Sequence, residues 1–162
     1  FQHSGIAPDV VTLAKGLGSR VPIGACLAKG VAANVFKPGN HASTFGGNPL
    51  ACSAALTTLE VIEEENLLRN AMEVGDFMRS LFKGQLADMP DVTEIRGQGL
   101  MIGIELTRPC GELVKEALKK GLLINVTSDK VVRLLPPLVI QRSEAEQVVN
   151  TLSPIVKEFL AA

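Results

Sequence analysis

Apolar residues recur along the chain with two different periods, and their spacing predicts secondary structure. The N-terminal part of the pattern predicts buried strands at residues 10–14 and 22–28, a short helix at 30–36, and longer helices at 48–64 and 66–87. Asn48 is a plausible N-cap, and Pro49 follows at the first helical position. We expect the helix at residues 48–64 to be largely buried and the helix at residues 66–87 to be amphipathic.

After residue 90 the pattern changes to short strands alternating with helices. It predicts strands at residues 92–96, 100–106, 122–126 and 131–135, a turn at 97–99 that Arg96 holds, and a helix at 110–120 that Gly121 stops. Ser143 and Glu146 form an S-x-x-E capping box before a final apolar helical pattern. Strands close together in sequence, with helices around them, predict a small α+β unit.

Composition narrows the class of protein. The chain has 162 residues, 46% of them apolar and 20% charged, and a formal net charge of -1, which is typical of a soluble globular α/β protein. It lacks a strongly basic stretch and an apolar run of the ~20 residues that span a bilayer, so neither nucleic acid nor membrane is an expected partner. Three cysteines without a C-x-x-C pair and only two histidines predict a reducing, cytoplasmic compartment and no metal site.

Lys15 is the first candidate for chemistry. It follows the apolar run that begins at Val10 and precedes Gly16 and Gly18, so the sequence places one amine at the end of a predicted strand. A lysine amine there suits a Schiff base with a carbonyl cofactor such as pyridoxal phosphate. The alternative is a surface lysine at a strand end, which composition alone favours because Lys and Arg total 16.

Two further segments carry candidate binding residues. Ser43 and Thr44 open a glycine-rich loop before Asn48, and hydroxyl and backbone N–H groups in such a loop suit a phosphate. The alternative is an ordinary turn that caps the helix. Arg133 lies inside a predicted strand, where a charge is unusual unless it is paired with a carboxylate of substrate or protein. The alternative is an arginine on the solvent face of an edge strand.

Five sequence blocks in this order carry a family resemblance. They are PDVVTLAKGLG, VPIGACLA, GNHASTFGGNPLACSAAL, IRGQGLMIGIEL and VVRLLPPLVI. The chain thereby resembles the class III pyridoxal-phosphate-dependent aminotransferases, in the acetylornithine and ornithine branch, over its whole length. The resemblance implies the C-terminal part of a fold-type I transferase: the end of the large α/β domain at residues 1–49, connecting helices at 50–89, and a small α+β C-terminal domain at 90–162.

The resemblance also implies roles for single residues. Lys15 holds pyridoxal 5'-phosphate covalently and then moves a proton between substrate and cofactor carbons. Thr44 binds the cofactor phosphate of the neighbouring subunit of a homodimer, and Ser43 contacts the amino-acid substrate. Arg133 binds a substrate carboxylate or pairs with an upstream glutamate. The family commonly has glycines where this chain has Ser19 and Arg20, which leaves the conformation of that loop open.

The implied reaction moves the terminal amino group of N-acetylornithine to 2-oxoglutarate in arginine biosynthesis. Ornithine, succinylornithine and 4-aminobutyrate as donors, a mutase or decarboxylase on the same scaffold, and a non-catalytic α+β interaction domain remain alternatives. The chain starts at Phe1 without methionine. We therefore expect a longer enzyme whose upstream part carries the aspartate for the pyridine nitrogen, and we expect this chain alone to be inactive.

Overall fold

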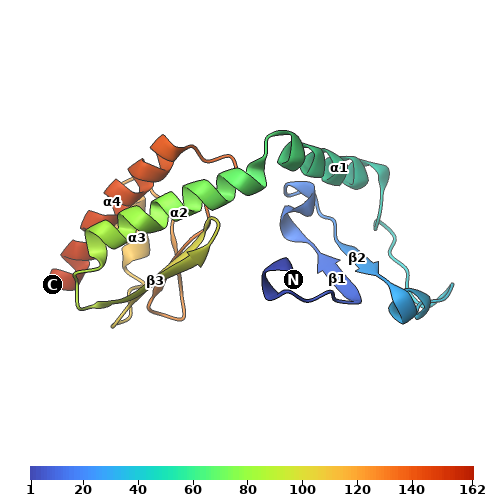
Figure 1. The fold of residues 1–162 in the computed structure, drawn as a ribbon, viewed down its shortest axis with the longest axis horizontal. Helices are drawn as coiled ribbons and strands as arrows, with labels where there is room; N and C mark the ends of the chain where they lie inside the picture. Colours follow the sequence, from blue (N-terminus) through green and yellow to red (C-terminus); the bar gives the residue numbers. More distant parts are fainter. The chain divides into compact units, whose positions relative to one another are not determined.

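The computed structural model describes all of residues 1–162, and their contacts fall into two units, residues 1–65 and residues 66–162. Each unit has a sheet of its own, with two strands in the first and four in the second. Figure 1 shows the elements along the chain. No helix combines the length and the apolar character needed to cross a bilayer.

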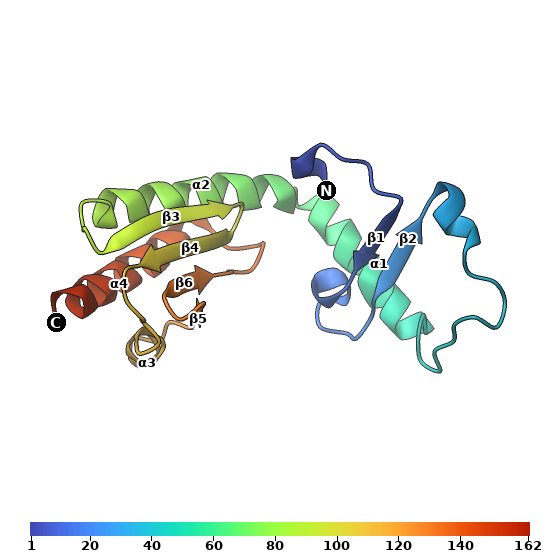
Figure 2. The same cartoon turned by 90° about the horizontal axis from the view of Figure 1, so that it is seen from below.

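In the first unit, a two-stranded sheet is followed by one long helix. Its main elements are strand β1 at Val10–Leu13, the 3-10 helix η2 at Lys15–Gly18, strand β2 at Ala25–Ala28, the 3-10 helix η3 at Gly30–Asn34, and helix α1 at Pro49–Glu64. The two strands pair antiparallel, and α1 contacts η2 (Figure 2). Asn48 caps α1 by accepting a hydrogen bond from the Ala51 amide at 3.0 Å, which confirms the predicted start of this helix.

Burial in the first unit differs from the prediction. The predicted buried strand β1 is mostly exposed, and helix α1 buries only its Ala51 and Ala55 side. Leu50 and Leu56, which were expected inside, are 76% and 58% exposed. A two-stranded sheet and one helix offer too few neighbouring side chains to enclose these apolar residues.

Four strands and three helices make up the second unit. They are α2 at Leu67–Leu86, β3 at Val92–Gln98, β4 at Met101–Leu106, α3 at Leu113–Lys119, β5 at Asn125–Thr127, β6 at Val131–Leu134 and α4 at Arg142–Ala161. The strand order is β3-β4-β6-β5, and every pairing is antiparallel. The expected strands and helices are present, although α3 and β5 each begin three residues later than predicted.

Helices α2 and α4 pack on one face of this sheet and form its core (Figure 2). Ile102, Ile104 and Val132 are fully buried there, with Phe82 from α2 and Leu152 from α4. Because side chains alternate between the two faces of a strand, residues such as Gly103 and Arg133 lie on the opposite face. The chemistry-bearing residues of this unit are therefore found on the face that these helices do not cover.

Two local details were predicted wrongly. The β3–β4 hairpin turns at Gly99 and Leu100, because Gln98 pairs with Met101, whereas the prediction put the turn at residues 97–99. The capping box of α4 lies two residues earlier than predicted, where the Gln141 amide donates to Glu144 at 2.8 Å. In the hairpin, Gly97 and Gly99 both favour a turn, and the register of the paired strands decides between them.

Ser153 lies in the core of the second unit with a hydroxyl that has no hydrogen-bond partner. Burying such a group costs free energy, so Ser153→Ala is expected to raise the free energy of unfolding by about 1–2 kcal/mol. Urea unfolding followed by circular dichroism would measure it. Ser80→Ala, at an exposed position of α2, changes only the helix propensity. A gain no larger than that of Ser80→Ala would contradict the cost assigned to the buried hydroxyl.

Candidate active site

Lys15 stands two residues after the end of β1 and opens η2. Its backbone is left-handed, with φ of 55°, which is uncommon for a residue with a side chain. The amine is exposed, has no hydrogen bond or ion pair, and lines a hollow of about 530 Å³. A free primary amine at the edge of an open hollow is the group that a carbonyl cofactor requires for covalent attachment.

Several residues near this lysine have strained backbone angles. The chain has six non-glycine residues with left-handed backbone angles, and Lys15, Ser19 and Arg20 are three of them. The Ser19 hydroxyl hydrogen-bonds the Thr58 hydroxyl of α1 at 3.0 Å, which ties this loop to the helix. Arg20 is exposed and lines the same hollow as Lys15. Strained backbone that is held in place in this way is a common property of functional loops.

The loop that carries Ser43 and Thr44 is exposed and leads into α1. The Gly46 amide donates to the Ser43 hydroxyl oxygen at 3.0 Å, so Ser43 has a local turn-forming role. The Thr44 hydroxyl has no partner. Neither residue lines the hollow of Lys15. Within one chain, the structure therefore does not bring Thr44 to the lysine, and the expected contact across a dimer stays a prediction.

Arg133 lies on β6, opposite Gly103 of β4 on one side and Asn125 of β5 on the other. Strand β6 is an inner strand of the sheet, so the alternative of an edge strand is wrong. The side chain is exposed on the face opposite the helices, forms no hydrogen bond or ion pair, and lines a hollow of about 260 Å³ with Arg96 and Gly103. Its guanidinium is unpaired and can form two parallel hydrogen bonds to a carboxylate, a bidentate pair.

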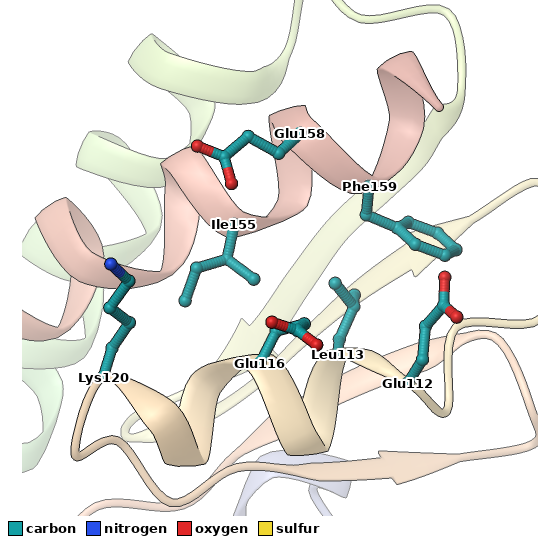
Figure 3. A pocket seen from close by; sticks show the side chains of 7 residues that line it. All are labelled: Glu112, Leu113, Glu116, Lys120, Ile155, Glu158 and Phe159. Carbon is teal, nitrogen blue, oxygen red and sulfur yellow. The ribbon is translucent and has the colours of Figure 1, made fainter.

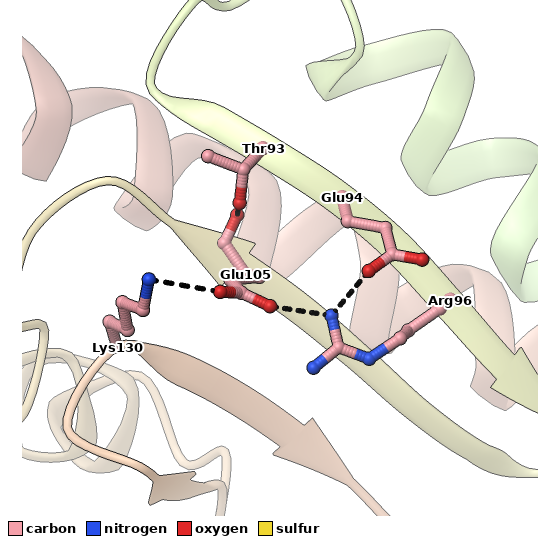
Figure 4. Close-up of polar contacts among 5 residues, drawn as sticks. All are labelled: Thr93, Glu94, Arg96, Glu105 and Lys130. Carbon is pink, nitrogen blue, oxygen red and sulfur yellow. Dashed lines mark hydrogen bonds and ion pairs between the residues drawn. The ribbon is translucent and has the colours of Figure 1, made fainter.

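The same face carries an ion network that the sequence did not reveal (Figure 4). Arg96 Nη1 donates to Glu94 and to Glu105, both at 2.7 Å, and Lys130 Nζ contacts the other Glu105 oxygen at 3.0 Å. The hydrogen bond from Arg96, and then that from Lys130, lowers the pKa of Glu105 below its ordinary value. Arg96 was expected to hold the turn at Gly97 and Gly99. Arg79 of α2 holds it instead, through a 2.8 Å bond to the Gly99 carbonyl.

A further hollow of about 300 Å³ lies between α3 and α4 (Figure 3). Glu112, Glu116 and Glu158 line it, and Lys119 pairs with Glu116 at 2.7 Å. None of the candidate residues for chemistry lies there. Residues 1–162 contain no group of three or more histidine, cysteine or acidic side chains that could hold a metal ion. The candidate chemistry therefore remains with Lys15 in the first unit and Arg133 in the second.

Comparison with known proteins agrees with this chemistry. The family of class III aminotransferases matches residues 1–156, and the chain belongs to this family. The acetylornithine aminotransferase of Nitrosomonas europaea is 66% identical over 160 residues, which are 99% of this chain and 41% of that protein. The chain therefore spans about two fifths of the length of the curated relatives that it matches.

Solved structures show the same fold. The ornithine aminotransferase of Toxoplasma gondii superposes with a TM-score of 0.91 at 34% identity, over 97% of this chain and 39% of that one. The acetylornithine aminotransferase of Elizabethkingia anophelis gives a TM-score of 0.88, also at 34% identity, over 97% of this chain and 41% of that one. These likenesses confirm the predicted fold class, a part of an α/β aminotransferase.

Proposed function

We propose that this chain supplies the cofactor-anchoring lysine and a carboxylate-binding arginine to an aminotransferase. That enzyme moves the terminal amino group of N-acetylornithine to 2-oxoglutarate. The observation that carries the proposal is the free amine of Lys15 on left-handed backbone, at the edge of an open hollow, in a chain of the class III family. The 66% identity to an acetylornithine aminotransferase favours this donor over ornithine.

Pyridoxal 5'-phosphate, when bound, supplies the electron-withdrawing ring that stabilises a carbanion on the substrate. Lys15 Nζ is suited to covalent attachment of pyridoxal 5'-phosphate, because no other group of the chain bonds to the amine. Once released by substrate, the same nitrogen would serve as the base that accepts the proton from the substrate carbon. The Thr44 hydroxyl, which has no partner within the chain, donates to a phosphate oxygen in the neighbouring subunit of a homodimer.

Ser43 and Arg133 have substrate-binding roles in this proposal. The Ser43 hydroxyl accepts from Gly46 and keeps its proton for donation to the amino-acid substrate. The Arg133 guanidinium binds a carboxylate of the amino acid or of the 2-oxo acid, or pairs with a glutamate of the complete enzyme. The reaction belongs to arginine biosynthesis in the cytoplasm. Neither nucleic acid nor membrane takes part.

A chimera tests the proposed reaction. The 160 residues of this chain that match the Nitrosomonas europaea acetylornithine aminotransferase would replace the matching segment of that enzyme, which is 66% identical to them. We expect amino transfer from N-acetylornithine to 2-oxoglutarate, measured as glutamate formed, at a rate within about tenfold of the parent enzyme. The 162-residue chain alone, as its control, is expected to give none. A folded chimera that loads cofactor and transfers from ornithine in preference to N-acetylornithine would overturn the choice of donor.

A further inference from the structure

On the face of the second sheet that α2 and α4 do not cover, the position of Gly103 lacks a side chain. Arg96 of β3, Gly103 of β4 and Arg133 of β6 pair in register across three strands. Gly103 has no side chain, and a Cβ there would meet only Val131 Cγ1 at 3.4 Å and Arg96 Cγ at 3.9 Å. The space over Gly103 is the hollow that Arg133 lines. No side chain from β4 therefore separates Arg133 from the charged groups around it.

Glu105 is the acidic residue best placed to fill that space. It lies two residues from Gly103, hence on the same face, and it pairs with Val131, which is two residues from Arg133. Such diagonal neighbours on an antiparallel sheet are within reach of long side chains. In the structure, however, Glu105 pairs with other cations, because Arg96 binds its Oε2 at 2.7 Å and Lys130 binds its Oε1 at 3.0 Å (Figure 4).

We propose that Arg96 and Lys130 are positioning residues that hold Glu105 away from Arg133 and so keep the Arg133 guanidinium free for a carboxylate. The inference rests on the carboxylate-binding role proposed for Arg133. Each oxygen of Glu105 has a cationic partner, and Arg133 has none. Without those two partners, Glu105 would cross the space over Gly103 and pair with Arg133, which would block the site from within the sheet.

The network is poorly suited to a purely stabilising role. The side chains of Arg96 and Lys130 are 44% and 45% exposed, and ion pairs at such positions add little to stability. Glu94 and Glu105 also face each other directly across β3 and β4, where like charges repel. Arg96 relieves this repulsion by binding both carboxylates. Replacing Arg96 and Lys130 is therefore expected to free Glu105 without unfolding the unit.

The first test uses the 162-residue chain and reads the pKa of Glu105 by carboxyl-carbon NMR. Arg96→Met and Lys130→Met remove the donors and keep the apolar stems. In this double variant we expect the pKa of Glu105 to stay below its ordinary value, because Arg133 becomes its partner. Adding Arg133→Gln should then return that pKa to the ordinary value. An ordinary pKa in the double variant, whether or not Arg133 is present, would overturn the proposal.

The second test uses the active chimera and separates this inference from the role of Arg133. The double variant should raise the KM for the substrate whose carboxylate Arg133 binds, N-acetylornithine or 2-oxoglutarate, about fivefold with kcat little changed. Glu105→Gln on that background should restore KM, whereas Glu94→Gln, the matched control, should not. Rescue by neither substitution would count against the positioning role. An unchanged KM for both N-acetylornithine and 2-oxoglutarate in Arg133→Gln alone would instead refute the carboxylate-binding role, whatever the pKa of Glu105 shows.

Discussion

Replacing Lys15 with alanine is expected to abolish covalent capture of pyridoxal phosphate and to lower amino transfer in the chimera by about 10³-fold or more. Both results depend on one atom, because in the proposed function the same nitrogen anchors the cofactor and moves the substrate proton. Cofactor capture is measured by absorbance, borohydride reduction and peptide mapping. Amino transfer is measured as glutamate formed from 2-oxoglutarate.

Lys29→Ala is the matched control for this experiment. Lys29 follows the other strand of the same sheet, is also exposed, and donates from Nζ to the Ala7 carbonyl at 3.3 Å. We expect its replacement to leave capture and transfer unchanged. Reduced cofactor found on a peptide other than that of Lys15, or equal losses in the two variants, would contradict the assignment of Lys15.

Local patterns in the sequence were enough to predict most elements of the fold. Asn48 and Pro49 signal the start of α1, and the apolar face of α2 includes the buried Val74, Met78 and Phe82. These signals depend on residues close together in the chain, so they need no knowledge of tertiary contacts. Lys15 was singled out from the sequence for the same reason, because an apolar run followed by lysine and glycines is a local motif.

Burial and ion pairing were less predictable because both depend on distant residues. The apolar runs of β1 and α1 are typical of buried elements, although residues 1–65 bury only Ala51 and Ala55 of them. The ion network requires Glu94 and Glu105 to face each other, which only the register of a two-residue hairpin determines. A prediction one residue off at that turn gives Arg96 the wrong role. Strand alternation and the position of the turn together are the signal that could have found the network.

The register of this hairpin depends on a close contact with α2 at Gly75. A Cβ added there would overlap the carbonyl oxygen and carbon of Gly99, at the tip of the hairpin. Both are backbone atoms, so the clash cannot be relieved by a side-chain rotation. Gly75→Ala is therefore expected to lower the free energy of unfolding of residues 66–162 by about 3 kcal/mol or more. Urea unfolding by circular dichroism would measure it.

Gly84→Ala in the same helix separates this clash from ordinary helix propensity. Nothing lies within 4 Å of a Cβ added at Gly84, so the substitution is expected to stabilise the chain by about 0.5–1 kcal/mol. If Gly75→Ala lowers the free energy of unfolding and Gly84→Ala raises it, the backbones of α2 and the hairpin are in contact at Gly75. If both variants stabilise the chain, the close approach is absent. Arg79 would still connect α2 to the hairpin tip, through its hydrogen bond to the Gly99 carbonyl.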